Sequence, residues 1–335
     1  MRALVLSAPG KAVVQDVPDP RPGPGAVVVA VHRVGVCGTD EELFRGSMAY
    51  FRSGRATYPL RPGHEWSGVV EAVGEGVARD WIGRRVTGDT MLADGTCDRC
   101  RTGRRHVCRN LAEVGISLGV DGALATSLVI PADSLHALPD AVDDAAGALV
   151  EPGGNAWRAA SAAWAEPGRR VLVWGSGTIG LLTAAFADAA GAEVHVIARR
   201  PEAAALARRF GATATWVPDA LPDLSFPSIV DATDDPAVAQ RAVDLVEPGG
   251  RVVTIGLAAA PSLVDTRTVT LKDVSVVGVL SGSPGLAAAI DAFASGSVDP
   301  RPLVGAVVGL DDAPAVLAGE IRGEDGPKIH IDPRR

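Results

Sequence analysis

Aromatic residues and cysteines are both scarce in this sequence. Aromatic residues make up 4% of the 335 residues, and the chain has four cysteines. So few cysteines in a chain of this length exclude a disulfide framework. Three of them, Cys97, Cys100 and Cys108, lie within one short segment. This clustering favours metal binding in a reducing compartment.

An excess of basic residues and a long apolar segment are also missing. The 32 basic residues are outnumbered by 40 acidic ones, and the net charge is -8. No basic stripe of the kind that a phosphate backbone requires is present, which argues against nucleic acid as a partner. The apolar run near the N-terminus is too short for a signal peptide or a membrane span. We therefore expect a cytoplasmic protein that acts on a small molecule and binds no membrane.

The pattern of apolar and turn-forming residues changes near residue 150. Before this point, short Val-rich runs alternate with Gly, Pro and Asp, which is typical of a mostly β, barrel-like domain. After it, apolar strands alternate with helical segments, as in residues 169–175, 178–190, 192–198 and 201–210. This rhythm predicts a doubly wound parallel sheet of the Rossmann type. We expect an α/β protein with the nucleotide domain at 149–296 and the β domain at 1–148 and 297–335.

A glycine motif follows the first predicted strand of the second domain. Gly175, Gly177 and Gly180 stand at the strand-to-helix turn, and Thr178 and Ile179 lie between the last two. Glycines at such a turn allow the backbone to approach a pyrophosphate at the helix N-terminus. We assign these five residues to dinucleotide binding.

The end of the next strand bears on the choice of cofactor. Folds that select NAD place an Asp or Glu there, but this chain has Ala198 followed by Arg199 and Arg200. An apolar residue removes the repulsion that a 2′-phosphate would meet, and a guanidinium can pair with that phosphate. We therefore expect NADP(H) in preference to NAD(H). The alternative is that both arginines are only solvated side chains at a strand end.

A long motif in the first domain identifies a family resemblance. Residues 63–77 contain G-H-E-x2-G-x5-G-x2-V, and the chain also carries G-V-C-G-T-D at 35–40 and L-V-E-P-G-G at 149–154. These motifs resemble the zinc-containing alcohol dehydrogenases of the medium-chain dehydrogenase/reductase superfamily, over essentially the whole chain. The resemblance implies a GroES-like catalytic domain, with the active site in the cleft between the two domains.

The same resemblance suggests a catalytic zinc site. It implies that Cys37, His64 and Glu151 bind the metal and that Glu65 lies beside it. Thiolate, imidazole and carboxylate are suitable zinc donors, and such a cation would lower the pKa of a bound alcohol or polarise a carbonyl. Taken singly, each residue could instead have an ordinary structural role.

Thr39, two residues after Cys37, matches the family position whose hydroxyl receives the substrate proton. Asp40 is expected to orient the site through hydrogen bonds. Many relatives carry a relay histidine five residues after the cysteine, whereas this chain has Glu42. The pattern C-G-T-D-x-E resembles that of glucose dehydrogenases within the superfamily.

A second metal site is indicated by the cysteine-rich segment. The family's structural zinc uses C-x2-C-x2-C-x7-C, and this chain has Asp94 in place of the first cysteine, followed by Cys97, Cys100 and Cys108. Zinc accepts carboxylate oxygen, so we expect these four residues to bind it. A lobe without metal, or one with His106 as the fourth donor, remains open.

The sequence is least informative about the substrate. A carboxylate ligand and the C-G-T-D-x-E pattern favour a sugar, cyclitol or other polyol, with a simple secondary alcohol as the alternative. Tyr50, Tyr58, Trp66 and Trp157 are candidates for the pocket wall, although packing explains them equally well. By analogy with the superfamily we expect a homodimer or homotetramer, joined near 274–279. Two other functions remain open: a zinc-free quinone or enoyl reductase, and a nucleotide-binding protein without turnover.

Overall fold

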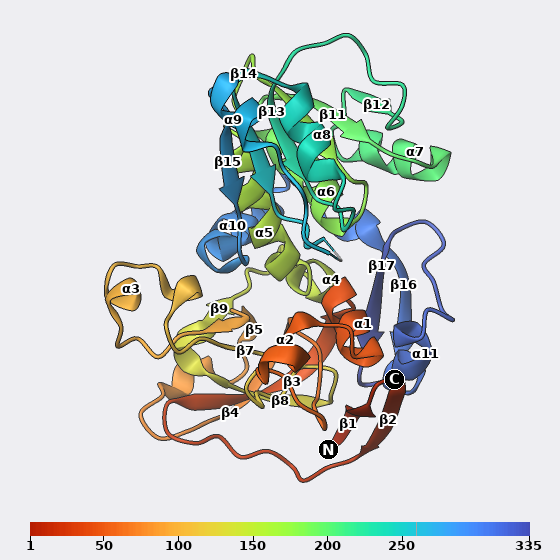
Figure 1. Ribbon diagram of the computed structural model, residues 1–335. Coiled ribbons are helices and arrows are strands. Elements are labelled where there is room, and N and C mark those ends of the chain that lie inside the picture. Colours follow the sequence, from red (N-terminus) through yellow and green to blue (C-terminus); the bar gives the residue numbers. More distant parts are fainter. Residues whose placement is uncertain (259) are drawn as a thin grey trace. The chain divides into compact units, whose positions relative to one another are not determined.

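The computed structural model describes residues 1–258 and 260–335, which form two compact units. Met1–Glu151 and Ile290–Arg335 make up the first unit, and Pro152–Ala289 the second. The first is rich in β-strands, and the second is built on a parallel sheet with helices on both of its faces (Figure 1). The predicted α/β fold class is therefore confirmed. Among the described residues, no helix is both long and apolar enough to cross a membrane.

A seven-stranded sheet forms the first unit. Strand β3 (Ala26–Gly35) is central, because it pairs with three other strands. All pairings in this sheet are antiparallel except the one between its last two strands. The other members are β4 (Glu65–Val73), β5 (Arg85–Gly88), β8 (Ser127–Pro131), β9 (Leu135–Ala137), β16 (Val304–Gly309) and β17 (Lys328–Asp332).

Smaller elements complete this unit. A hairpin is formed by β1 (Arg2–Ala8) and β2 (Lys11–Asp16), and a second small sheet by β6 (Met91–Leu92) and β7 (Ala112–Glu113). The helices are short, which is typical of a β-rich unit. They are α1 (Gly38–Arg45), α2 (Ala49–Ser53), α3 (Asp98–Arg101), α4 (Asp144–Gly147) and α11 (Ala313–Leu317), while α5 (Val150–Ala162) runs into the second unit.

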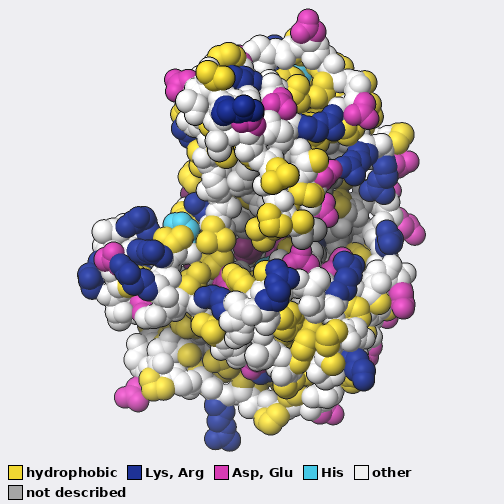
Figure 2. Space-filling view, in the orientation of Figure 1, with side chains coloured by type: hydrophobic (Ala, Val, Ile, Leu, Met, Phe, Trp, Pro, Cys, Tyr) yellow, Lys and Arg dark blue, Asp and Glu magenta, His cyan; other side chains and the backbone are white. Residues whose placement is uncertain are grey.

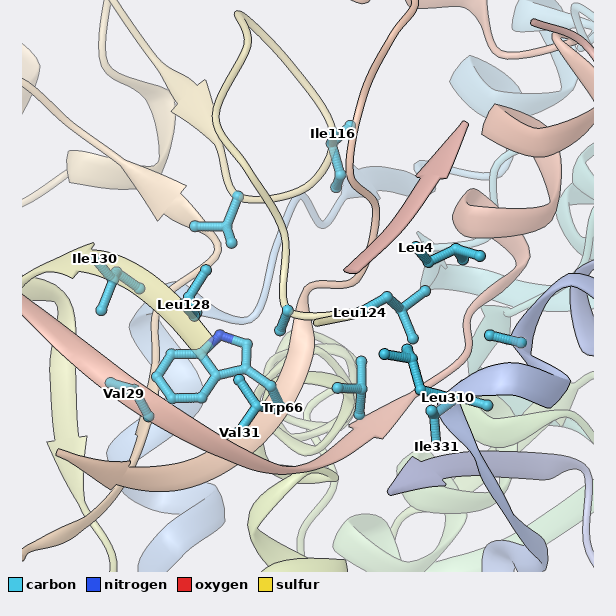
Figure 3. Packing of buried hydrophobic residues seen from close by; sticks show 14 of the residues in the cluster. Leu4, Val29, Val31, Trp66, Ile116, Leu124, Leu128, Ile130, Leu310 and Ile331 are labelled. Atoms are coloured by element: carbon cyan, nitrogen blue, oxygen red, sulfur yellow. The ribbon is translucent and has the colours of Figure 1, made fainter. Parts of the chain in front are cut away.

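The core of the first unit is organised around Trp66. Its indole is fully buried and lies among branched aliphatic side chains from several strands (Figure 3). Alternate residues of β3, such as Val29 and Val31, point to this core, as the two-residue period of a strand requires. Trp66 therefore serves packing, and the suggestion that it walls a substrate pocket is wrong.

The second unit has a six-stranded parallel sheet with strand order β12-β11-β10-β13-β14-β15. Numbered along the chain this order is 3-2-1-4-5-6, the arrangement that binds dinucleotides at the point where the order reverses. The strands are β10 (Arg170–Trp174), β11 (Glu193–Ile197), β12 (Ala214–Trp216), β13 (Phe226–Asp231), β14 (Val246–Thr254) and β15 (Ser275–Gly278). The helices are α6 (Thr178–Ala189), α7 (Pro201–Arg209), α8 (Val238–Leu245) and α9 (Thr266–Leu271), while α10 (Leu286–Ser295) begins in this unit and ends in the first.

Continuous burial explains the apolar composition of the central strands. In β10, residues 171–174 are all buried, because helices cover both faces of the sheet. This continuous burial differs from the alternation of core-facing side chains in β3. It accounts for the change in the pattern of apolar residues near residue 150. The glycine motif follows β10 directly, so the centre of the sheet positions it.

Candidate functional site

Cys37 lies between β3 and α1. It is the residue that caps the N-terminus of α1, and its backbone N–H donates to Asp40 Oδ2 over 2.9 Å. The Asp40 carboxylate satisfies a donor that the helix itself leaves unpaired. The thiol of Cys37 is half-buried, and its position is therefore set by the first turn of the helix.

His64 and Glu65 stand at the start of β4, after a glycine that the fold requires. Gly63 has φ +101°, and a Cβ there would lie 2.7 Å from the backbone nitrogen of Leu124. The Gly63 N–H donates to Asp40 Oδ1 over 3.0 Å. The G-H-E motif thus turns tightly against the segment at Leu124 and is fixed to α1 by Asp40.

Asp40 also faces the imidazole of His64. Its Oδ1 lies 3.5 Å from His64 Nδ1, and both side chains are buried. Burial opposes a charge on the ring, but the Asp40 carboxylate and the Cys37 thiol outweigh it and raise the pKa of His64 well above its usual value. Burial likewise opposes a charge on Asp40, while His64 and two backbone N–H groups lower the pKa of that carboxyl. The site therefore favours positive charge at His64.

Three potential metal donors converge at this point. One ligand atom from each of Cys37, His64 and Glu65 lies within 4.8 Å of the others. Thiolate, imidazole and carboxylate suit zinc, and the attraction of the site for positive charge suits a cation. Glu151, the other expected ligand, is buried in the first turn of α5 and is not part of this three-donor group of described residues.

Glu65 has a partner of its own in the interior. Lys328 Nζ donates to both carboxylate oxygens, over 2.9 and 2.7 Å, and to the carbonyl of Val36. Both side chains of this ion pair are almost fully buried. Burial lowers the pKa of Lys328, but Glu65 outweighs it and the net direction is upward. Sequence reasoning missed Lys328, because it lies 263 residues from Glu65 along the chain.

Thr39 and Glu42 lie on the first two turns of α1. Thr39 is the second residue of the helix and follows Cys37 by two positions. Both side chains are half-buried. The helix therefore places a hydroxyl and a carboxyl on the element that also carries Cys37.

The second predicted metal group comes together in the lobe formed by residues 94–110. Cys97 Sγ lies 3.5 Å from Cys100 Sγ and 3.9 Å from Cys108 Sγ, and Asp94 Oδ1 lies 3.2 Å from Cys108 Sγ. Donors at Zn–S distances of about 2.3 Å stand about 3.8 Å apart in a tetrahedron. The spacing therefore fits one zinc ion, and the four-donor group contains Asp94 rather than His106.

Hydrogen bonds in the lobe favour the charged forms of Asp94 and Cys97, whereas burial raises the pKa of Cys100 to about 11. Thr96 N–H and the Asn110 amide lower the pKa of Asp94, and Asn110 Nδ2 donates to Asp94 Oδ2 over 2.6 Å. Backbone N–H groups of Arg109 and Cys100 lower the pKa of Cys97 to about 6. Zinc requires deprotonated ligands, so these hydrogen bonds prepare Asp94 and Cys97 for binding.

A basic surface surrounds this lobe. Figure 2 shows Lys and Arg side chains gathered over α3, and the lobe carries Arg99, Arg101, Arg104, Arg105 and Arg109. Two of them form ion pairs, Arg105 with Asp133 and Arg109 with Asp98. Three thiolates and a carboxylate carry more negative charge than one zinc ion neutralises. The arginines therefore offset charge locally in a chain that is acidic overall.

The glycine motif forms the turn after β10 in the second unit. Gly175 has φ +120°, and a Cβ on Gly180 would lie 2.1 Å from the carbonyl oxygen of Gly175. A Cβ on Gly177, by contrast, would meet nothing within 4 Å. Gly177 precedes Thr178, the first residue of α6, at the exposed end of the turn. This geometry leaves the backbone open to a pyrophosphate at the helix N-terminus.

Ala198 directly follows β11 and is buried, and its N–H donates to the carbonyl of Trp216 over 2.8 Å. Arg199 and Arg200 are exposed, and Arg200 caps α7. Sequence reasoning did not anticipate that Arg199 Nη2 lies 3.4 Å from Asp235 Oδ2. Asp235 comes from the connection between β13 and α8, on the other side of β10.

The aromatic insert between the Cys37 and His64 motifs is held by the protein itself. Tyr50 and Arg55 both contact the buried Glu113, over 3.3 and 3.4 Å. Phe51 stacks on Tyr58 at 4.6 Å, and the Tyr58 hydroxyl donates to the carbonyl of Leu43. These contacts account for the conformation of the insert.

Comparison with protein families matches both parts of the chain. Residues 23–140 match the alcohol dehydrogenase GroES-like domain, and residues 178–295 match the zinc-binding dehydrogenase family. An L-threonine 3-dehydrogenase of Saccharopolyspora erythraea is 35% identical over 291 residues, which are 83% of each chain. The starvation-sensing protein RspB of Escherichia coli K12 is 29% identical over 314 residues, which are 91% of each.

Solved structures resemble the whole chain. An RspB structure from Escherichia coli CFT073, complexed with NADH, has a TM-score of 0.91 and 27% identity and covers 99% of both chains. A Sinorhizobium meliloti protein assigned as a zinc-binding dehydrogenase and bound to NADP has a TM-score of 0.91 and 28% identity, with the same coverage. The family resemblance seen in the motifs is thus confirmed, and structural neighbours bind either nicotinamide cofactor.

The lobe geometry predicts that Asp94→Ala lowers the zinc content by one equivalent per chain and lowers the melting temperature, because structural zinc contributes folding free energy. Metal analysis and calorimetry of the purified protein measure both. Asp98→Ala is the matched control, since this lobe acid pairs with Arg109 and is not in the donor group. Unchanged zinc content and melting temperature in Asp94→Ala would show that Asp94 is not a ligand.

Proposed function

Since the chain belongs to the zinc-type alcohol dehydrogenase family of the medium-chain dehydrogenase/reductase superfamily, we propose that it is a zinc-dependent oxidoreductase. It transfers a hydride between NADP(H) and a secondary alcohol or its ketone. The observation that carries this proposal is the three-donor group at Cys37, His64 and Glu65, in which His64 and Glu65 are buried and which Asp40 holds.

Each residue of the proposed site has a distinct role in alcohol oxidation. Bound zinc supplies a Lewis acid that makes an alcohol easier to deprotonate. Cys37 and His64 would hold the metal, and Asp40, which faces Nδ1 of the imidazole, would orient that ring. Thr39 accepts the substrate proton at its hydroxyl oxygen. The Thr39 hydroxyl would release its own proton in exchange, to the cofactor ribose, and Glu42 stands where many relatives have a relay histidine.

Glu151 is proposed as the third protein ligand, with Glu65 beside the metal. Both oxygens of Glu65 already accept hydrogen bonds from the buried Lys328. Zinc binding by Glu65 would have to compete with this ion pair, at a cost in electrostatic free energy. Glu151 is buried in the first turn of α5 and carries the remaining carboxylate of the family pattern.

The proposed substrate class is a polyol, sugar or cyclitol. The carboxylate at Glu42 and the proposed carboxylate ligand Glu151 support it, because both match sugar- and polyol-oxidising branches of the family. Relatives named L-threonine 3-dehydrogenase add threonine to the substrates that should be tested, since threonine also presents a secondary alcohol beside polar groups.

The four cysteines form no disulfide with one another in the described part of the chain, which supports a reducing, cytoplasmic setting.

NADP(H) is the proposed cofactor in preference to NAD(H). Ala198 leaves no carboxylate at the end of β11 itself, and the exposed guanidinium of Arg199 follows it directly. A guanidinium forms a forked, charge-assisted pair with phosphate oxygens. Arg199 is the main phosphate contact in this proposal, and Arg200 assists it or stacks on the adenine.

A homodimer or homotetramer joined at the edge strand β15 is also proposed. β15 ends the parallel sheet, and large apolar side chains are exposed on and around it: Leu257, Leu263, Leu271, Val276 and Leu280. The exposed fractions of Leu263 and Leu271 reach 88% and 87%. An unpaired apolar edge is a ready surface for association with a second copy.

Removing the thiolate tests the zinc mechanism. We expect Cys37→Ser to lose one zinc per chain and to lower kcat by at least about 100-fold, because a hydroxyl is a poor zinc ligand at neutral pH. Activity is followed as nicotinamide absorbance over a panel of sugars, cyclitols, L-threonine and simple alcohols. Asp98→Ala serves as the control that keeps both zinc ions. A metal-free but active Cys37→Ser protein would contradict the proposal.

Cofactor choice is tested by comparing kcat/KM for NADP and NAD. The wild type should favour NADP, and Ala198→Asp/Arg199→Leu should reverse the preference by introducing repulsion and removing the guanidinium. Wild-type preference for NAD, or a ratio untouched by the double change, would show that the strand end does not select the cofactor.

Association at β15 is tested by light scattering at micromolar concentration. Val276→Asp should shift the protein toward the monomer, because a charge at the edge strand opposes pairing. Val13→Asp is the control, since Val13 is similarly exposed on β2 of the other unit. A monomeric wild type would refute the proposal.

A further inference from the structure

The ion pair between Arg199 and Asp235 crosses the centre of the parallel sheet. Arg199 follows β11 and Asp235 follows β13, and these strands are the two neighbours of β10. Adjacent strands lie about 4.8 Å apart, so the pair connects positions about 10 Å apart. The pair therefore lies at the carboxyl edge of the sheet that also carries the glycine turn, where a dinucleotide binds in this fold.

Asp235 is held in place by its own loop. Asp231 Oδ1 accepts the Thr233 N–H over 3.0 Å and the Thr233 hydroxyl over 2.7 Å. Asp235 N–H in turn donates to Thr233 Oγ1, and Asp235 Oδ1 accepts the Ala237 N–H over 3.0 Å. One carboxylate oxygen is thus fixed to the backbone, and the other faces Arg199.

Arg199 is free to change partners, whereas Asp235 is anchored. The Arg199 side chain is 68% exposed, and its contact with Asp235 is a single long one at 3.4 Å. Exposed pairs of this kind are weak, and a guanidinium prefers a forked contact with phosphate. A 2′-phosphate bound by Arg199 would then have a fixed carboxylate as its neighbour.

We propose that Asp235 is a specificity-determining residue that competes with the cofactor's 2′-phosphate for Arg199 and weakens the preference for NADP(H). This inference rests on the proposed role of Arg199. The Asp235 carboxylate pairs with Arg199 when no 2′-phosphate is present and repels the phosphate when it binds. NAD(H), which lacks the phosphate, does not have to displace this pair.

Calorimetric binding of adenosine 2′,5′-bisphosphate and of 5′-AMP to the full-length protein tests the proposal without turnover. Asp235→Asn should bind the bisphosphate about three- to tenfold more tightly than wild type and leave 5′-AMP binding unchanged, since it removes one repelling charge and one competitor. The neighbouring Asp234→Asn is the matched control. It removes the same charge from the exposed side chain one residue away and should increase the affinity for the bisphosphate less than Asp235→Asn does.

Arg199→Leu separates this inference from the proposed cofactor. If Asp235 acts through Arg199, Asp235→Asn should increase the affinity for the bisphosphate less in the Arg199→Leu background than in the wild-type background. An equal increase in bisphosphate affinity in both backgrounds, or no increase in either, would overturn the inference. A wild type that binds 5′-AMP as tightly as the bisphosphate, but acquires a preference through Asp235→Asn, would contradict the proposed NADP selectivity and support the role of Asp235.

Discussion

The proposed metal site depends on one fully buried carboxylate, that of Asp40. Its oxygens accept the backbone N–H groups of Cys37 and Gly63 and face the ring of His64. Two segments that are distant in sequence, the start of α1 and the G-H-E turn before β4, are thereby fixed to one point. A buried charge is costly unless it is paired and hydrogen-bonded, and here every contact also positions a proposed metal ligand. The same interaction therefore serves folding and the site.

The two units position their ligands by different physical means. In the first, short helices and tight turns carry thiol, imidazole and carboxylate groups, and buried ion pairs such as Glu65 with Lys328 hold them. In the second, the centre of a parallel sheet places the backbone of the glycine turn, and charged side chains lie around its carboxyl edge. The proposed metal site thus depends on side-chain electrostatics, whereas the proposed nucleotide site depends first on backbone geometry.

The fold class could be predicted from local sequence patterns, and so could the approach of Cys37 to His64 and of Asp94 to the three cysteines of the lobe. The glycine turn, the G-H-E motif and the cysteine spacing each lie within a short stretch, so their geometry is encoded locally. The contacts of Glu65 with Lys328 and of Arg199 with Asp235 could not be predicted, because they depend on strand order and join distant residues. Trp66 was misjudged for a related reason. Its place in the sequence near His64 suggested that it lines the substrate pocket, but the alternation of side chains along β4 directs its indole into the core.

The central claim, that Asp40 prepares the site for zinc, is tested most directly by the zinc affinity of Asp40→Asn. This change keeps the size of the side chain and removes its charge. Competition with a chromophoric chelator measures the affinity of each zinc separately from turnover. The account predicts that one of the two zinc ions is bound about 10- to 100-fold more weakly while the lobe zinc is retained. Unchanged affinity for both ions would contradict it.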